Sequence, residues 1–217
     1  MFTKFSRQKK TNPNGEMILL PQPTHDSDTS VEKALQSRRS CRQYQDAPLT
    51  LTEISQLLWA AQGITHPQGY RSAPSAGALY PLEVYLIVGN IEELPAGVYK
   101  YLPEEHALVN TAEGDMRKNL SEAALGQEAL REGAVIILIA AVYERTLGKY
   151  GDRAPRYVHM EVGCAAQNVY LQAVSLELGT VFIGAFYDEE VKRIAQLEKE
   201  EQPLCLLPVG VKSAFAP

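Results

Sequence analysis

The spacing of hydrophobic positions predicts two helices where regular patterning begins. The stretch "SVEKALQSRR" starts with Ser30, a good N-cap residue, and carries Glu32 in its first turn, where a carboxylate favours the helix dipole. The stretch "TLTEISQLLWAAQG" places its large apolar residues on one helical face, with Thr50 or Thr52 as the candidate cap and Gly63 as the stop. We therefore expect each helix to pack one face against a core.

Several later segments have the patterns of strands. "LEVYLIVG" predicts one strand, and "GVYKYLPEEHALVN" predicts a hairpin that turns at Pro103 to Glu105. "AVIILIAAV", from Ala134 to Val142, is apolar without interruption, which predicts a strand covered on both faces. "TVFIGAF" is expected to form a short strand or a turn, and "PLCLLPVG" the last strand.

Helical patterns separate these strands. They run from Asp115 to about Arg131, from about Arg156 to Leu178, and through "DEEVKRIAQL", where Asp188 is the predicted cap. The longest contains a run of small residues, 163–166, which lets another helix approach closely, either inside the core or at a subunit interface. Because strands and helices do not alternate regularly, the pattern favours an α+β fold over a doubly wound sheet.

The chain divides into an N-terminal arm and one folded domain. Residues 1–29 are rich in Pro, Asn, Thr and Asp and show little periodicity, which is typical of an extended arm. Residues 30–217 hold all the predicted elements, and a single domain of this size is common. Within it, "ITHPQGYRSAPSAGALYP" is too rich in Gly, Pro and Ser to form an element, and loops of this length are often functional.

Composition and charge limit which binding partners and which cellular compartment we expect for this protein. A net charge of -5 with 45% hydrophobic and 22% charged residues is ordinary for a globular protein, and no basic stripe suggests nucleic-acid binding. The best apolar run is too short to cross a bilayer, and the N-terminus lacks the apolar core of a secretory signal. The cysteines and histidines lack metal-ligand spacing. We expect a cytoplasmic protein with no metal and no nucleic-acid or membrane partner.

The first segment with candidate chemistry is "SRRSCRQY". It groups Arg38, Arg39 and Arg42 with the hydroxyl of Ser40, and Arg38 and Arg42 share a face if the helix continues through them. Guanidinium groups bind phosphate oxygens in pairs, so this segment is a candidate phosphate cradle. It is equally compatible with a solvated basic helix end that complements the helix dipole.

Two further segments are candidates. In "APSAGALYP" the residues from Pro74 to Gly77 lack bulk, so the backbone can approach a flat ligand, although a surface loop without a ligand has the same composition. In "RTLGKYGDRAPRYVHMEVG", Lys149 and Tyr150 are neighbours on an expected loop. An ammonium beside a phenol can bind a carbonyl and move a proton, but adjacent Lys and Tyr also occur by chance.

Taken in order, these segments resemble the nitroreductase family, and within it the SagB/thiazole-oxidase branch of FMN-dependent dehydrogenases. The resemblance rests on "RRSCRQY", "PSAGALYPLEVYLIV", "KYGDRAPRY" leading into "EVGCAAQNVYLQAVSLELG", and the closing "LCLLPVG". It covers roughly residues 30 to 212. It implies a nitroreductase-like α+β fold with a mixed, mostly antiparallel central sheet flanked by helices, and an obligate homodimer with FMN at the interface.

The resemblance also implies a role for individual residues. The flavin phosphate would be held by Arg38, Arg39, Ser40 and Arg42, with Lys212 completing that site. Pro74, Ser75, Ala76 and Gly77 would lie along the isoalloxazine ring, and Ile183 and Gly184 would supply backbone groups near its reactive part. Lys149 and Tyr150 would be the catalytic pair, taking a proton from a heterocycle carbon while a hydride passes to flavin N5, or running the reverse delivery.

The substrate is open at this stage. The family's Gly-Tyr pair after "KYGDR" is replaced by Ala154 and Pro155, which is expected to stiffen the segment beside Lys149, and a frequent histidine in the long helix is Cys164. A peptide heterocycle or a small molecule would suit the leading interpretation. The alternatives are an NAD(P)H-dependent reductase of nitroaromatics or quinones, and a flavin-binding structural subunit of a modification complex.

Overall fold

Seven strands form one sheet in the structure, a computed structural model that describes residues 17–214. The strand order is β1-β4-β3-β2-β5-β7-β6, and every pairing between neighbouring strands is antiparallel. The strands are β1 (Met17–Leu19), β2 (Leu82–Val88), β3 (Gly97–Leu102), β4 (Ala107–Glu113), β5 (Val135–Val142), β6 (Leu178–Thr180) and β7 (Glu201–Val211). Among the described residues, parallel pairing occurs only in two isolated bridges. The predicted α+β class with a mostly antiparallel sheet is confirmed.

Both helices predicted at the start of the domain are present. Helix α1, Val31–Ser37, begins after Ser30, whose side chain accepts a hydrogen bond from the amide three residues later. Helix α2, Leu51–Gln62, begins after Thr50, which forms a capping box with the glutamate three residues later. Each start therefore follows from a side chain that satisfies an otherwise unpaired amide.

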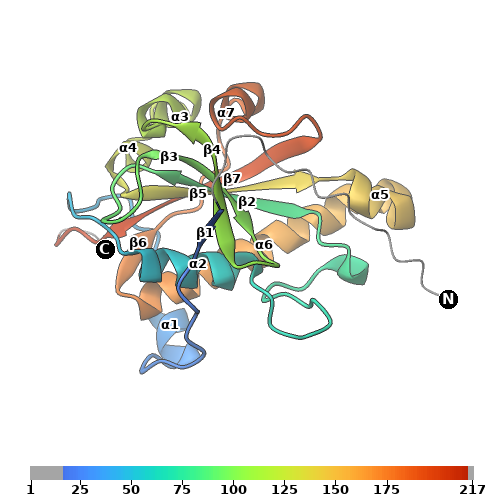
Figure 1. The fold of residues 1–217 in the computed structure, drawn as a ribbon, viewed down its shortest axis with the longest axis horizontal. Helices are drawn as coiled ribbons and strands as arrows, with labels where there is room; N and C mark the ends of the chain where they lie inside the picture. The colour runs from blue at the N-terminus through green and yellow to red at the C-terminus, as the bar shows by residue number, and fades with distance from the viewer. Residues whose placement is uncertain (1–16, 215–217) are drawn as a thin grey trace.

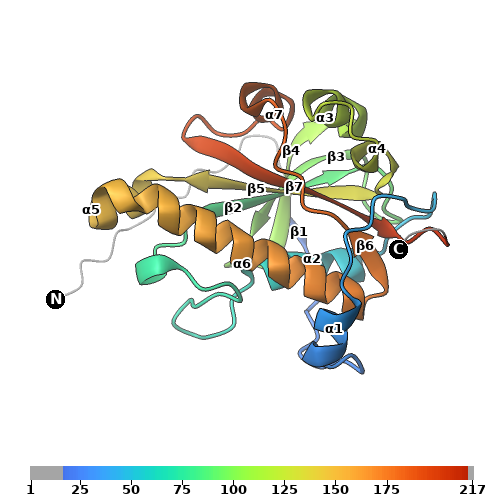
Figure 2. The same ribbon diagram turned by 180° about the vertical axis from the view of Figure 1, so that it is seen from behind.

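The sheet separates two hydrophobic cores (Figure 1). Successive side chains of β5 point to opposite faces, so Ile137 and Ile139 join the core under α2 and α6, whereas Ile136 and Leu138 join the other. Helix α6, Ala154–Ser175, runs across the first face (Figure 2). The second face is covered by α3 (Arg117–Ala123), α4 (Ala129–Glu132) and α7 (Asp188–Ile194). The prediction that β5 is covered on both faces is confirmed.

Three helix predictions need correction. The helix expected from Asp115 to Arg131 is two short helices, because Leu125 and Gly126 between them adopt positive φ angles of 61° and 75°. Helix α6 begins two residues before the predicted start and ends at Ser175, because the chain turns there to enter β6. Asp188 is the first residue of α7 and not its cap, since Tyr187 occupies the cap position without a side-chain hydrogen bond.

The described part of the predicted arm follows the sheet edge. Strand β1 pairs with β4, and the amide of Leu20 donates to the His106 carbonyl at 3.0 Å. Residues 1–16 of the arm lie outside the described residues. No helix in the described range is both long and apolar enough to span a bilayer.

Candidate active site

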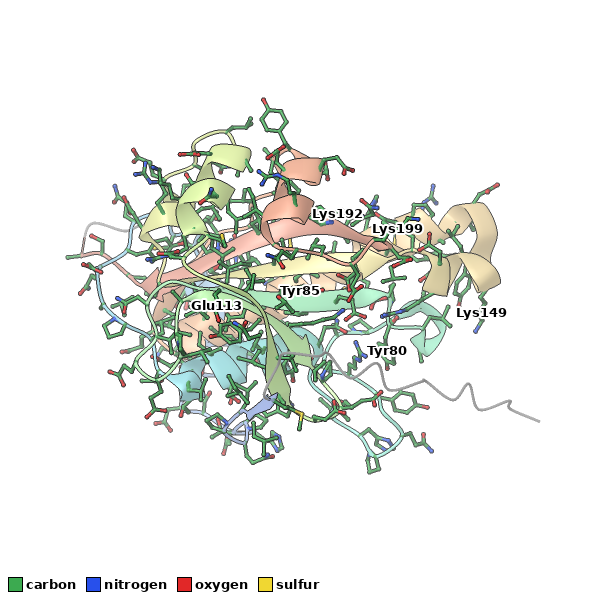
Figure 3. The ribbon with its side chains drawn as sticks, turned by 45° about the horizontal axis from the view of Figure 1, so that its top comes forward. Tyr80, Tyr85, Glu113, Lys149, Lys192 and Lys199 are labelled. Atoms are coloured by element: carbon green, nitrogen blue, oxygen red, sulfur yellow. The ribbon has the colours of Figure 1, made fainter. Side chains whose placement is uncertain are left out.

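Lys149 and Tyr150 lie in the last turn of helix α5, Glu144–Tyr150, and not on the loop that the sequence predicts. The helix follows β5 almost directly, and Arg145 in its first turn fixes its position. The Arg145 guanidinium donates to the Tyr80 carbonyl at 2.9 Å and forms an ion pair with Glu83 on β2. Figure 3 shows Lys149 projecting from α5 on the side of the molecule where Tyr80 lies. Helix α5 is therefore tied to strand β2 and to the long loop before it.

That loop contains a strained turn. Gly77, Ala78 and Tyr80 have φ angles of 65°, 54° and 48°. In a residue with a Cβ, a left-handed backbone costs about 1–2 kcal/mol, and such strain is concentrated at functional sites. The hydroxyl of Ser75 accepts a hydrogen bond from the Tyr80 amide at 2.9 Å, which closes the turn. The strain favours the functional interpretation of this loop.

The catalytic candidates meet the loop at Gly77. A Cβ added to Gly77 would lie 2.8 Å from Lys149 Nζ and 2.8 Å from the Tyr150 hydroxyl oxygen. Lys149 Nζ also lies 5.5 Å from the centre of the Tyr150 ring, and that ring packs edge-on against Tyr157 at 4.9 Å. The structure thus brings together two of the segments selected from the sequence, with both polar atoms directed at the bare backbone of Gly77.

A buried acid lies beneath the same loop. Glu161 on α6 is only 3% exposed, and its Oε1 atom has no hydrogen-bond partner. Burial raises the pKa of Glu161 to about 7, against the lowering effects of a hydrogen bond with Ser75 and of the charge of Arg71. Two turns further along α6, the side-chain amide of Asn168 donates to the Ser72 carbonyl at 3.3 Å. Helix α6 therefore contacts the loop at two points.

The arginine segment has a different conformation from the one expected. Helix α1 ends at Ser37 and Arg38 has an extended ψ of 121°, so Arg38 and Arg42 do not share a helical face. The Arg38 guanidinium lies 5.1 Å from the ring centre of Tyr170, and Arg42 is exposed. The Arg39 guanidinium donates to two carbonyls of its own segment, at 3.0 and 2.7 Å. The prediction of a shared helical face was therefore wrong.

Tyr170 and Gly179 organise the surroundings of the arginine segment. The Tyr170 hydroxyl lies 3.2 Å from the Ser40 hydroxyl and accepts a hydrogen bond from the Phe182 amide at 2.7 Å. A Cβ on Gly179 would lie 2.8 Å from Lys212 Cγ and 2.6 Å from Cys41 Sγ, and Ser40 is bridged to Thr180, the next residue after this glycine. The structure therefore places Arg38, Ser40 and Lys212 in one region around Tyr170 and Gly179.

Ile183 and Gly184, the residues expected near the reactive part of the ring, come directly after Phe182 in the chain. Ile183 is buried and exchanges two backbone hydrogen bonds with Leu206, each 2.9 Å long, while Gly184 is exposed. Gly184 lines a cavity of about 470 Å³ with Phe182, Phe186 and the hydrogen-bonded pair Tyr143 and His159. An aromatic cavity thus continues from the cationic segment along the same side of α6.

The two groups of candidate residues lie on opposite flanks of α6. A helix turns by about 100° per residue, so Tyr170 and Asn168 point about 200° apart. The cationic group contacts the Tyr170 flank, whereas the loop and the Lys149 pair adjoin the Asn168 flank. Between the flanks runs an exposed strip that includes Met160, 60% exposed, and Gly163, whose Cβ position is open. One chain therefore carries two groups of candidate residues separated by this strip, and each group is called a half-site below.

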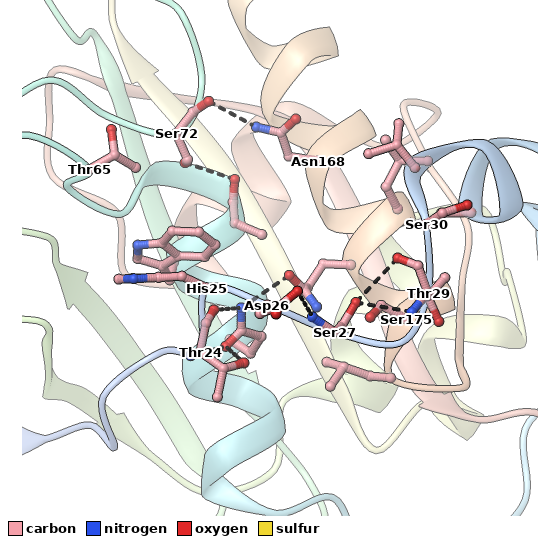
Figure 4. A pocket seen from close by; sticks show the side chains of 18 residues that line it. Thr24, His25, Asp26, Ser27, Thr29, Ser30, Thr65, Ser72, Asn168 and Ser175 are labelled. Atoms are coloured by element: carbon pink, nitrogen blue, oxygen red, sulfur yellow. Dashed lines mark hydrogen bonds between the residues drawn. The ribbon is translucent and has the colours of Figure 1, made fainter.

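A larger cavity, of about 700 Å³, opens between α1, α2 and α6 (Figure 4). It is lined by Ser72 and Asn168 on one side and by His25 and Ser30 on another, and none of the site residues predicted from the sequence lines it. Within residues 17–214, no three His, Cys, Asp or Glu side chains gather in a way that would hold a metal ion. This cavity is therefore separate from the residues selected from the sequence.

Three residues of these half-sites are not among the candidate residues selected from the sequence: Arg145, Glu161 and Tyr170. A charge on a short helix, an acid within a long helix and an aromatic residue near a helix end are common patterns. Their importance depends on partners far along the chain, such as Tyr80 for Arg145 and Ser75 for Glu161. No local signal would have selected them.

Comparisons with known proteins identify the family of this chain. The nitroreductase family model matches residues 35–211. A protein of Methanocaldococcus jannaschii named as a nitroreductase is 50% identical over 182 residues, which cover 84% of this chain and 91% of that protein. A crystal structure described as a nitroreductase from Ralstonia eutropha superposes with a TM-score of 0.81 at 27% identity, covering 92% of this chain and 90% of that one.

The SagB/thiazole-oxidase resemblance is also supported. The microcin B17-processing protein McbC of Escherichia coli is 31% identical over 157 residues, which cover 70% of this chain and 58% of McbC. A chain in the structure of the E. coli microcin synthetase McbBCD complex, with truncated pro-MccB17 bound, matches with a TM-score of 0.69 at 27% identity and covers 90% of this chain and 78% of that one. With the nitroreductase-like fold also confirmed, the chain belongs to the nitroreductase family of oxidoreductases.

Proposed function

We propose that this protein is an FMN-dependent oxidoreductase of the SagB type, which moves a hydride between a substrate and flavin N5 while Lys149 and Tyr150 manage the proton. The observation that carries the proposal is the contact at Gly77. The lysine ammonium and the tyrosine hydroxyl both reach the one residue of the strained turn that has no side chain. A flat ring against this turn would have both groups at its edge, within reach of a substrate.

The residues on the other flank of α6 suit the phosphate end of FMN. Arg38, Arg42 and Lys212 supply positive charge, and Ser40 supplies a hydroxyl, which together form a suitable donor set for a phosphate monoester. Gly184 exposes its backbone next to an aromatic cavity, where an amide can approach a ring closely. Flavins are typical cofactors of the family, and this donor set fits one.

Each residue of the pair has a distinct task. Bound FMN supplies the hydride acceptor or donor at N5. In the oxidation direction the Tyr150 phenolate takes a proton from one substrate atom while the hydride leaves the neighbouring carbon, and in the reverse direction the Tyr150 phenol returns that proton. The Lys149 ammonium, 5.5 Å from the Tyr150 ring centre, stabilises the negative charge that develops on the phenol oxygen or on a substrate carbonyl. Arg145 keeps the pair in place by fixing α5.

A second copy of the chain completes each site in this proposal. The residues proposed to bind the phosphate and the loop proposed to bind the ring lie on opposite flanks of α6, so we infer that one flavin takes these two sets of contacts from two different chains. The exposed strip between them, with Met160 60% exposed and Gly163 open, suits packing against the same strip of a second copy. A homodimer would place the loop of one chain over the cationic segment of the other.

The substrate class follows from the two kinds of relative. Similarity to the microcin B17-processing protein McbC supports a peptide heterocycle as substrate, used together with partner proteins. The 50% identity to a protein named as a nitroreductase supports a second candidate function, NAD(P)H-dependent reduction of nitroaromatics or quinones. Anaerobic mixing with NADPH separates them, because rapid bleaching of the flavin is expected only of the reductase.

The first test is the visible spectrum of the purified protein, together with the effect on turnover of replacing both Lys149 and Tyr150. Purified protein should show a flavin spectrum and release FMN. Exchanging Lys149→Ala together with Tyr150→Phe should leave it yellow and slow turnover by on the order of 100-fold or more, the usual contribution of a positioned acid and base. The matched control is Lys118→Ala with Tyr187→Phe, two exposed residues of α3 and the α7 cap. Protein that takes up no FMN, or a double variant as active as this control, would refute the proposal.

A further inference from the structure

Glu161 is an unusual residue for its position in the fold. Its side chain is 3% exposed, and among the described residues it is one of four whose side chains have a buried polar atom without a hydrogen-bond partner. Burial is the largest influence on its pKa, which rises to about 7, while the Ser75 hydroxyl and the Arg71 guanidinium act in the opposite direction. A carboxylate buried with one unpaired oxygen is costly, so this site favours the neutral acid.

The connection from Glu161 to the catalytic pair runs through Ser75. The Ser75 hydroxyl interacts with Glu161 and also accepts the Tyr80 amide at 2.9 Å. Two residues beyond Ser75, Gly77 meets the Lys149 and Tyr150 side-chain ends. A change at Glu161 would therefore reach the surface where the pair meets the loop, through the turn that the Ser75 hydroxyl helps to close.

Helix α6 holds the loop by one titratable contact and one neutral contact. Asn168 donates to the Ser72 carbonyl at 3.3 Å and keeps that bond at every pH. The Glu161 contact differs, because the neutral carboxyl can donate a hydrogen bond and the ionised one can only accept. Ionisation would draw nearby donors, including the Ser75 hydroxyl, toward the carboxylate and so shift the turn, even while the Ser75 oxygen still accepts the Tyr80 amide.

We propose that Glu161 is a positioning residue that acts through Ser75, and that its protonated form holds residues 72–78 in the arrangement that accepts the flavin. This inference rests on the function proposed above. It assigns to the buried acid a task outside the proton transfer itself, namely control of the loop on which the ring would lie.

Other ionisable groups approach this layer from each neighbouring element. The loop contributes Arg71, which donates to Gln62 of α2 at 2.8 Å and lies 4.6 Å from the Tyr80 ring centre. Helix α5 contributes Lys149 and Tyr150 across Gly77. Helix α6 contributes Tyr157, in contact with the Tyr150 ring. A variant confined to Glu161 is therefore needed to assign any pH dependence to this acid.

The first measurement uses the protein without flavin. Carboxyl carbons labelled with ¹³C in all glutamates are followed by NMR as the pH is raised, and the signal missing from Glu161→Gln identifies residue 161. The expected midpoint is near 7. A midpoint near 4.5, the ordinary value for glutamate, would overturn the inference.

The second measurement is FMN affinity against pH, by quenching of flavin fluorescence. If only the neutral form accepts the ring, the Kd of the wild type should rise about tenfold between pH 6 and pH 8, beyond the change seen in Glu161→Gln. Ionisation of the FMN phosphate is common to all variants and cancels in that ratio. In Ser75→Ala, the additional rise of the FMN Kd with pH should be lost. In Glu122→Gln, an exposed change on α3, that rise should be kept.

The outcomes separate this inference from the proposed function. If no variant binds FMN at any pH, the proposed function fails. If FMN binds and Glu161→Gln shows the same pH dependence as the wild type, only the role of Glu161 is overturned. If the FMN Kd of Ser75→Ala rose with pH as much as that of the wild type, the connection through Ser75 would likewise be refuted.

Discussion

Replacing Gly77 by alanine tests the contact on which the proposed mechanism depends. Gly77 has a φ of 65°, where an alanine costs about 1 kcal/mol of backbone strain. Its new Cβ would lie 2.8 Å from Lys149 Nζ and from the Tyr150 hydroxyl oxygen. A relaxed contact is near 3.5 Å, so these atoms must move by about 0.7 Å. Both are the ends of flexible side chains, and the displacement therefore affects their position more than the stability of the fold.

The expected result is a small loss of stability with a large loss of activity. A cost of about 1 kcal/mol lowers the Tm by about 3 °C in a protein of this size. Misplacing catalytic atoms by nearly 1 Å lowers turnover by about tenfold to hundredfold. Turnover is measured with whichever probe the wild type uses, NADPH with nitrofurazone or a thiazoline peptide with oxygen, and Tm by thermal denaturation.

The same loop offers a matched control. Gly69 has a φ of 82°, and an added Cβ would meet nothing within 4 Å. Gly69→Ala therefore introduces comparable strain without touching the pair, and it should lower the Tm with turnover nearly unchanged. If Gly77→Ala and Gly69→Ala had equal turnover, the contact at Gly77 would have no part in the chemistry.

Three further predictions concern the supporting residues. The native Glu161 carboxyl keeps its proton between pH 4.5 and about 7, where the unfolded chain has released it, so wild-type stability falls as the pH rises through this range. Glu161→Gln should therefore be more stable than wild type by about 3 kcal/mol at pH 8 and similar at pH 4, as urea unfolding would show. Arg145→Met leaves Glu83 without one of its cations and should lower the free energy of unfolding by about 2 kcal/mol. It should also loosen α5, which would be seen as faster hydrogen exchange of the α5 backbone amides. Tyr170→Phe leaves the Phe182 amide unpaired and should cost about 1–3 kcal/mol by the same urea assay, whereas an unchanged midpoint would contradict the hydrogen bond.

The sequence predicts the elements that depend on local signals. Ser30 and Thr50 mark helix starts because their side chains satisfy nearby amides, and the unbroken apolar run of β5 identifies an interior strand covered on both faces. Helix α5 was missed because its seven residues include Gly148 and no clear apolar stripe, so its helical state depends on Arg145 and the contacts of its ends. The break at Leu125 was missed because a left-handed leucine is rare.

The sequence likewise predicts some features of the candidate site and not others. Residue types and order selected Lys149, Tyr150 and the loop before β2 as separate candidates. Their meeting at Gly77 depends on how β2 and β5 lie side by side, which the sequence pattern does not encode locally. The separation of the two half-sites across α6 likewise follows from the path of the helix over the sheet.

The strand order has a consequence for how the protein folds. Strand β5 pairs with β2 and β7, neither of which is its neighbour in the chain, and both α5 and α6 lie in the segment between β5 and β7. These long-range pairings close large loops, so folding is expected to take milliseconds to seconds. The elements that carry the half-sites can be fixed only once the centre of the sheet has assembled. Recovery of cofactor binding during refolding should therefore coincide with recovery of the whole fold.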